Sequence, residues 1–152
     1  MADKLQFELV SPERLLLSEA VAMVVVPGSE GNFGVLPGHS LLISTVRPGV
    51  IDVYADEQTE ITERIFVSGG FAEVTAERCT VLADEAMPIS SLDRAALDQE
   101  HKVLAGTVAS LNDQAARLSG PERDPVLVEL RVAERRLAVA DAKLAALAEA
   151  AH

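Results

Sequence analysis

The stretch Ser68–Asp93, SGGFAEVTAERCTVLADEAMPISSLD, contains a β pattern followed by the start of a helical one. Phe71 and Val74 stand among small or charged residues, which favours a half-buried strand. Ser68-Gly69-Gly70 separates this run from the one before it, and a glycine pair there predicts a hairpin turn. After Met87-Pro88 the pattern becomes helical, so we expect a domain border near residue 88.

Upstream of this stretch, short β-prone runs separated by turn residues continue back to Leu5. They read LQFELV, RLLLS, AVAMVVVP, LLISTV, VIDVYA and ITERIFVS, and FAEVTA and CTVLAD follow them within the quoted stretch. Many short strands with turn signals between them are typical of an antiparallel sandwich or barrel. We therefore expect residues 1–88 to form one all-β domain.

Downstream, residues 89–152 predict an antiparallel pair of helices. Ser90 and Ser91 offer an N-cap, and Asp93 suits the first helical turn. Ser119-Gly120-Pro121 predicts the end of the first helix, and Asp124-Pro125 predicts the start of the second. So short a connection makes the two helices antiparallel neighbours.

Each predicted helix carries one apolar stripe. The stripes are Leu97, Leu104, Val108, Leu111, Ala115 and Leu118, and then Leu130, Ala133, Leu137, Ala140, Leu144 and Leu147. Because alanine buries little area, and burial stabilises by only about 25 cal/mol per Å², we expect this hairpin to be held weakly and to be able to detach.

Composition and charge exclude several classes of partner. With 152 residues, 49% of them hydrophobic, the chain suits one domain or a small domain with an appendage. A net charge of −11 and an aromatic content of 3% argue against nucleic acid. Residues 1–88 carry 14 acidic and 5 basic side chains, whereas Arg131, Arg135 and Arg136 gather basic charge on the second helix. That face either meets an acidic protein surface or is simply solvated.

The chain shows no pattern for crossing or entering a membrane. The opening residues lack a basic region followed by an apolar block, so we expect no signal peptide. The longest apolar run, Ala20–Pro27, is far shorter than the roughly 20 residues that span a bilayer. Membrane association is therefore expected only through a partner. Cys79, the single cysteine, excludes an internal disulfide and reads as a buried structural thiol.

The stretch EGNFGVLPGH, residues 30–39, is rich in glycine but matches no chemical motif. It has neither a GxGxxG order nor a terminal Gly-Lys-Ser/Thr, and a strand-like run follows it, so it does not predict phosphate binding. His39, His101 and His152 have no second ligand at metal spacing, which argues against zinc. We therefore expect a loop that places Glu30, Asn32, Phe33 and His39 at one end of the domain. These residues either only shape the turn or form a contact surface.

Several segments together resemble one known family. They are Val10-Ser11-Pro12-Glu13, GxFGVLPGH, Arg47-Pro48-Gly49-Val50, FVSGGFAEV and TVLADEA, followed by the helical hairpin. In this order and spacing they resemble the epsilon subunit of F-type ATP synthase over nearly the whole chain. The resemblance implies an α+β fold with segregated parts: an antiparallel β-sandwich of about ten strands and then an antiparallel helical hairpin. It also implies a non-catalytic rotor subunit at the foot of the central stalk, in contact with the gamma subunit and the c-ring.

The resemblance also implies roles for particular residues. Glu30, Gly31 and Asn32 would face the c-ring, and His39 and Phe33 would lie nearer gamma. The C-terminal helices would reach the alpha and beta catalytic subunits and restrain ATP hydrolysis. Because of their basic charge, Arg131, Arg135 and Arg136 on the second helix are our candidates for that contact. The chain would be peripheral on the cytoplasmic face of a bacterial inner membrane, as part of the complex.

One departure from the family bears on nucleotide binding. Some members bind ATP through a Leu/Ile-Asp-x-x-Arg-Ala segment, and here Ala96 stands at the arginine position, leaving Asp93 alone. Arg94 lies two residues early, about 200° away around a helix. We expect no tight ATP binding and no cofactor.

Two other functions compete with the rotor subunit. The alternative is a free-standing β-sandwich interaction module that dimerises through its helical hairpin. An enzyme with His39 as general base ranks third, because the sequence supplies no partner acid or nucleophile.

Overall fold

The computed structural model describes residues 3–150, so His152 lies outside the described residues. The chain divides into two compact units between Ser91 and Leu92, here called the β unit and the helical unit. Within the β unit ten strands form one sheet. The strands are β1 (Leu5–Ser11), β2 (Arg14–Val21), β3 (Met23–Gly28), β4 (Gly31–Val35), β5 (Leu42–Val46), β6 (Gly49–Tyr54), β7 (Glu63–Val67), β8 (Gly70–Val74), β9 (Arg78–Ala83) and β10 (Ala86–Pro88).

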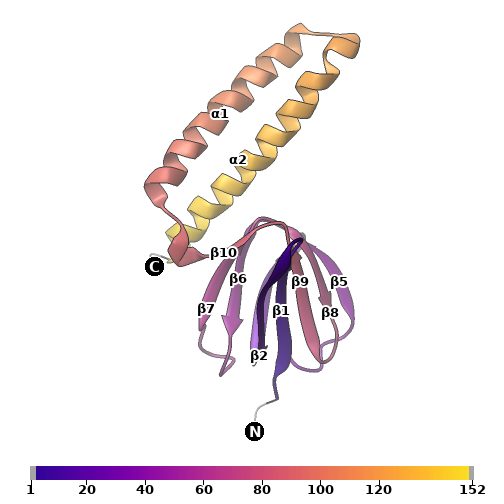
Figure 1. Cartoon of the computed structure of the whole chain (residues 1–152), viewed down its shortest axis with the longest axis vertical. Coiled ribbons are helices and arrows are strands. Elements are labelled where there is room, and N and C mark those ends of the chain that lie inside the picture. Colours follow the sequence, from indigo (N-terminus) through magenta and orange to yellow (C-terminus); the bar gives the residue numbers. More distant parts are fainter. Residues whose placement is uncertain (1–2, 151–152) are drawn as a thin grey trace. The chain divides into compact units, whose positions relative to one another are not determined.

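The sheet runs in the order β10-β7-β6-β3-β5-β8-β9-β1-β2, with β4 paired to β3. It curls around a single core (Figure 1), which confirms the predicted sandwich of about ten strands. Burial alternates along β1, where Leu5, Phe7 and Leu9 are buried and the residues between them are not. The other strand pairs of the sheet are antiparallel, as predicted, and β1 and β9 pair in parallel.

The predicted hairpin at Ser68-Gly69-Gly70 was also wrong. β7 pairs with β6 and β10, whereas β8 pairs with β5 and β9. The chain therefore crosses at the glycine pair from one part of the sheet to another. Gly69 and Gly70 have φ of +125° and +145°, and a Cβ on Gly70 would collide with the Leu82 carbonyl. Positive φ suits a crossing as well as a hairpin, so only the strand partners distinguish the two.

The helical unit is an antiparallel pair, α1 (Arg94–Arg117) and α2 (Asp124–Ala150), which lie side by side in Figure 1. Short 3₁₀ turns, η1 (Ile89–Ser91) and η2 (Gly120–Glu122), precede α1 and α2. The buried helical residues are Leu97, Leu111 and Ala115 on α1 and Leu130, Ala133, Ala140 and Ala146 on α2. All except Ala146 belong to the predicted stripes, so the helical periodicity identified the packed faces correctly.

The predicted cap of α1 was misplaced. Asp93 is the N-cap, and its carboxylate accepts from the Ala95 and Ala96 backbone N–H groups at 3.0 and 3.4 Å. Ser91 does not cap, because its hydroxyl donates to the Pro88 carbonyl at 2.7 Å. Further along, His101 Nε2 lies 2.6 Å from Asp141 Oδ1, which joins α1 to α2 by a polar bond.

Candidate partner-binding site

The turn between β3 and β4 carries the three residues expected to face a ring. Glu30 lies in the turn, while Gly31 and Asn32 already belong to β4 and pair with Gly28 and Pro27 of β3. The expected loop is thus partly a strand, since β4 spans Gly31–Val35. Sequence reading missed β4 because glycine and asparagine are poor strand formers, and here the pairing with β3 overrides that preference.

A shallow groove of about 480 Å³ lies beside this turn. One wall is Gly28–Phe33 and the other is Leu42–Thr45 of β5. The structure therefore brings Glu30, Asn32 and Phe33 together, as expected, and adds β5, which was not foreseen as part of the site. Glu30 is the only ionisable side chain among the residues that line the groove. A surface groove of this kind can bind a protein segment.

The turn is fastened to the end of β5 by several polar contacts. Ser29 donates its backbone N–H to the Thr45 carbonyl at 3.0 Å, and the Thr45 hydroxyl donates to Ser29 Oγ at 2.7 Å. The Arg47 guanidinium donates to the Gly28 carbonyl at 2.5 Å and to Asn32 Oδ1 at 2.6 Å. The sequence analysis named Arg47 only within a segment that carries the family resemblance and gave it no role.

A second feature, the apolar patch, lies on the outer face of β5, β8 and β9. It consists of Leu41, Ile43, Phe71 and Leu82, whose exposed fractions are 74%, 71%, 56% and 45%. Phe71 stands directly opposite Thr45 of β5 and Leu82 of β9, so Ile43 and Phe71 are diagonal neighbours on one face. Clustered exposed apolar side chains are typical of a surface that binds another molecule. The sequence analysis did not predict this cluster.

His39 and Phe33, expected near gamma, have different surroundings. His39 lies two residues before Leu41, at the edge of the apolar patch, and its Nδ1–H donates to the Ser40 carbonyl at 2.6 Å. That bond to a neighbouring backbone group is not a catalytic dyad. Phe33 is half-buried and packs against the core of the β unit, while it also lines the groove. Phe33 therefore anchors the β4 side of the hairpin to the core of the β unit.

In the helical unit, Arg131, Arg135 and Arg136 are exposed on α2. Val128 and Val132, exposed by 60% and 47%, lie within the same turns. The exposed side of α2 is thus both basic and apolar. Asp93, the remaining residue of the nucleotide motif, uses its carboxylate as the helix cap described above.

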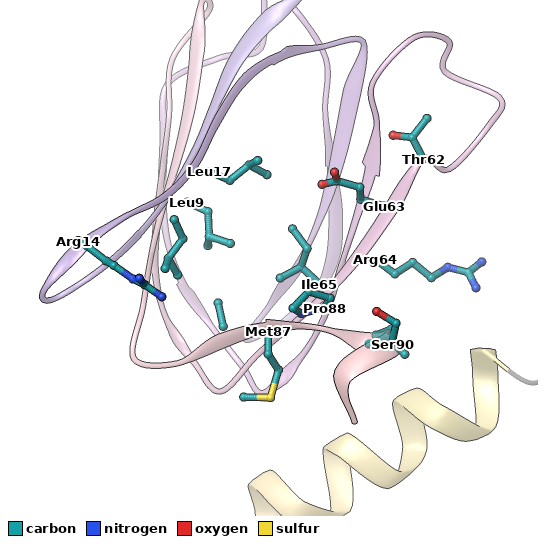
Figure 2. A pocket seen from close by; sticks show the side chains of 13 residues that line it. Leu9, Arg14, Leu17, Thr62, Glu63, Arg64, Ile65, Met87, Pro88 and Ser90 are labelled. Carbon is teal, nitrogen blue, oxygen red and sulfur yellow. The ribbon is translucent and has the colours of Figure 1, made fainter. Parts of the chain in front are cut away.

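A larger cavity of about 640 Å³ is lined by residues of strands β1, β2, β7 and β10. Figure 2 shows Leu9, Leu17 and Ile65 around it, with Arg64 directed away. Its other lining residues are Arg14, Leu16, Thr62, Glu63, Ala86, Met87, Pro88, Ile89 and Ser90. None of these lining side chains is a histidine or a cysteine.

The remaining candidate functional features are the single cysteine, the metal-ligating residue types and the helices. Cys79 is buried, and burial raises the pKa of its thiol to about 12, which suppresses the nucleophilic thiolate. Among residues 3–150, no group of three or more His, Cys, Asp or Glu side chains is arranged to hold a metal ion. Within the same range, neither helix is long and apolar enough to cross a bilayer.

Comparisons with known proteins point to one family. Residues 4–89 match the family model for the beta-sandwich domain of the ATP synthase delta/epsilon chain. The ATP synthase epsilon chain of Rhodospirillum centenum is 54% identical over 145 residues, covering 95% of this chain and 92% of that protein. The epsilon chain of Parvibaculum lavamentivorans is 49% identical over 131 residues, covering 86% and 98%.

A solved structure shares the fold. It is a chain in the cryo-EM structure of Euglena gracilis mitochondrial ATP synthase, described as OSCP/F1/c-ring in rotational state 1. The TM-score is 0.62 at 23% identity, and the match covers 98% of this chain and 82% of that one.

Proposed function

The chain belongs to the ATP synthase epsilon chain family, and from that premise we propose that it is a non-catalytic rotor subunit linking a c-ring to a gamma subunit. The observation that carries this proposal is the apolar patch. Ile43 and Phe71 are more than half exposed and belong to a cluster of exposed apolar side chains on an acidic unit. Leaving such a surface in water is unfavourable, and covering it with a partner removes the cost.

We assign the patch and the neighbouring His39 to the gamma contact, and the β3–β4 turn with Glu30, Gly31 and Asn32 to the c-ring contact. Both features border β5, the patch through Ile43 and the turn through Thr45. A single strand thus connects the two proposed interfaces. The subunit would be peripheral on the cytoplasmic face of a bacterial inner membrane, held there by its partners.

Binding to purified gamma tests the proposal. The wild-type chain should form a 1:1 complex by size-exclusion chromatography with light scattering. Phe71→Asp should weaken that complex by at least about tenfold, because a charge replaces buried apolar area at the interface. Leu15→Asp, at an equally exposed position on β2, is the matched control. A stable homodimer that ignores gamma would instead support the free-standing interaction module.

We propose in addition that the helical unit acts as a brake on ATP hydrolysis through α2. The basic and apolar surface around Arg131, Arg135 and Arg136 supports this, since it suits an acidic surface on the alpha and beta subunits. Replacing the three arginines by glutamine in the complete enzyme should raise ATP hydrolysis severalfold. Arg94→Gln together with Arg117→Gln on α1 is the control for lost charge, and unchanged hydrolysis in the α2 variant would refute the brake.

We propose finally that the hairpin does not bind ATP tightly. Ala96 has no guanidinium, and the Asp93 carboxylate is occupied by two backbone N–H groups. Titration calorimetry with ATP should show no heat of binding at micromolar ATP. A micromolar affinity for the wild-type chain would contradict this proposal.

A further inference from the structure

We propose that Arg47 is a positioning residue, which locks the β3–β4 turn onto β5 so that the turn and the apolar patch form one rigid platform. The inference has two parts. That Arg47 holds the turn in place is independent of the proposed function, whereas the effect on partner binding rests on it. Arg47 follows β5 directly and precedes β6.

The guanidinium of Arg47 holds both strands of the β3–β4 hairpin at once. Its Nη1 donates to the carbonyl of Gly28, the last residue of β3, and its Nη2 donates to Oδ1 of Asn32 in β4. The Arg47 backbone N–H donates to the Pro27 carbonyl at 2.9 Å. Three donors of one residue thus reach three positions around a single turn.

The turn needs such a fastening because it has little packing of its own. Ser29, Glu30, Gly31 and Asn32 are exposed, and Gly31 has φ of +137° with nothing near the site of a Cβ. With few buried contacts of its own, the turn would otherwise open locally at low cost.

The same contacts connect the turn to the apolar patch. Thr45, which bonds Ser29 through its hydroxyl and carbonyl, stands opposite Phe71 in the β5–β8 ladder. A force applied at Glu30 or Asn32 therefore passes through the Arg47 and Thr45 contacts into β5 and on to the patch. This makes Arg47 important for transmission, even though it belongs to neither proposed contact surface.

Arginine is chemically suited to this position. Its planar fork presents two N–H groups at fixed spacing, which suits two separate acceptors. A lysine ammonium carries the same charge but lacks the fork. Arg47→Lys should therefore recover charge without recovering the two-point attachment.

Hydrogen exchange on the full chain tests the structural half. In Arg47→Ala the amides of residues 29–32 should exchange at least about tenfold faster, while amides of β1 and β9 stay as in the wild type. Arg47→Lys should show an intermediate rate. Arg64→Ala is the matched control, because it also removes one arginine of the β unit, ion-paired with Asp52 at 3.7 Å on other strands. Exchange at residues 29–32 that stays within twofold of the wild type would overturn the inference.

Binding to a purified c-ring with gamma tests the functional half. Wild type and Arg64→Ala should bind alike, and Arg47→Ala should bind about tenfold more weakly, the scale of one lost charged hydrogen bond. Arg47→Lys keeps the charge without the two-point attachment; it serves if Arg47→Ala fails to fold, and it should also bind more weakly than the wild type. If the wild type does not bind, the proposed function fails while the exchange result still decides the role of Arg47. If the wild type and Arg47→Ala bind equally well, the inference fails alone.

Discussion

At the residue scale, Gly70 is the position that tolerates a side chain least. Its φ is +145°, and an added Cβ would meet the Leu82 carbonyl and approach Ala83 Cα to 3.0 Å. Gly70→Ala should lower the free energy of unfolding by about 2–4 kcal/mol, measured by urea denaturation. Gly31→Ala also requires positive φ but meets nothing within 4 Å, so it should cost only about 1 kcal/mol. Equal losses at the two sites would show that the contact with Leu82 is unimportant.

Glu19 on β2 is a residue whose charge works against folding. Its Oε1 is buried without a hydrogen-bond donor, and burial, followed by the nearby Glu63, raises the pKa of its carboxyl. A raised pKa in the folded state means that folding favours the protonated form. The stabilisation that this raised pKa gives is therefore fully present at acid pH, below the ordinary pKa of a glutamate carboxyl. It is lost as the pH rises through the raised pKa of the folded state.

Glu19→Gln removes this penalty without changing shape. It should stabilise the protein at pH 7 by about 0.5 kcal/mol, a figure reduced for solvent screening, and should have little effect below about pH 4. Urea denaturation at the two pH values measures the difference. Glu13→Gln in the exposed β1–β2 turn is the control, and a gain at pH 4 equal to that at pH 7 would contradict the explanation.

At the element scale, α1 carries a glycine with no structural need for it. Gly106 is exposed in the middle of the helix, its φ is ordinary, and an added Cβ would meet nothing within 4 Å. Gly106→Ala should stabilise the helical unit by about 0.5–1 kcal/mol, because alanine loses less backbone entropy in a helix. Thermal melting by far-UV circular dichroism measures it. Ala109→Gly, also exposed on α1, should have the opposite sign, and a lower melting temperature for Gly106→Ala would refute the prediction.

Strands and helices with a clear hydrophobic period could be predicted from the sequence. Strands that form only because a neighbouring strand pairs with them could not. Eight β-prone runs matched strands, and both helices were found. β4 and β10 were missed, because GNFGV and AMP have poor strand propensity and are held by β3 and β7. The crossing at Gly69-Gly70 and the parallel β1–β9 pair depend on distant partners, so no local signal specifies them.

The same limit applies to the site. Glu30, Gly31 and Asn32 could be placed in one turn from the sequence, since they are adjacent. The part that β5 and Arg47 play in the site could not be predicted. It depends on contacts between residues 15 to 19 positions apart in the chain, as in Asn32–Arg47 and Gly28–Arg47. The apolar patch likewise requires the β5–β8–β9 register.

At the scale of the whole molecule, each unit has a core of its own. The core cluster of the β unit draws only on strands, from Leu5 to Ala83, and Leu111, Leu130 and Ala133 form a separate small cluster between α1 and α2. The predicted border at residue 88 lies close to the division at Ser91. Burial of the β-unit core, which includes Phe7, Ile51 and Val53, stabilises that unit through the hydrophobic effect.

A chain ending at Ser91 tests independence and regulation together. Because its core residues all remain, the truncated chain should unfold cooperatively in urea and bind gamma about as tightly as the full chain. Ending at Ser91 rather than Pro88 keeps Ile89, which is buried, and the Ser91–Pro88 bond. In the reassembled enzyme, loss of the helical unit should leave ATP synthesis intact and raise ATP hydrolysis severalfold. Non-cooperative unfolding would show that the β unit depends on the helices, whereas normal folding with unchanged hydrolysis would show that the helical unit is not a brake in this protein.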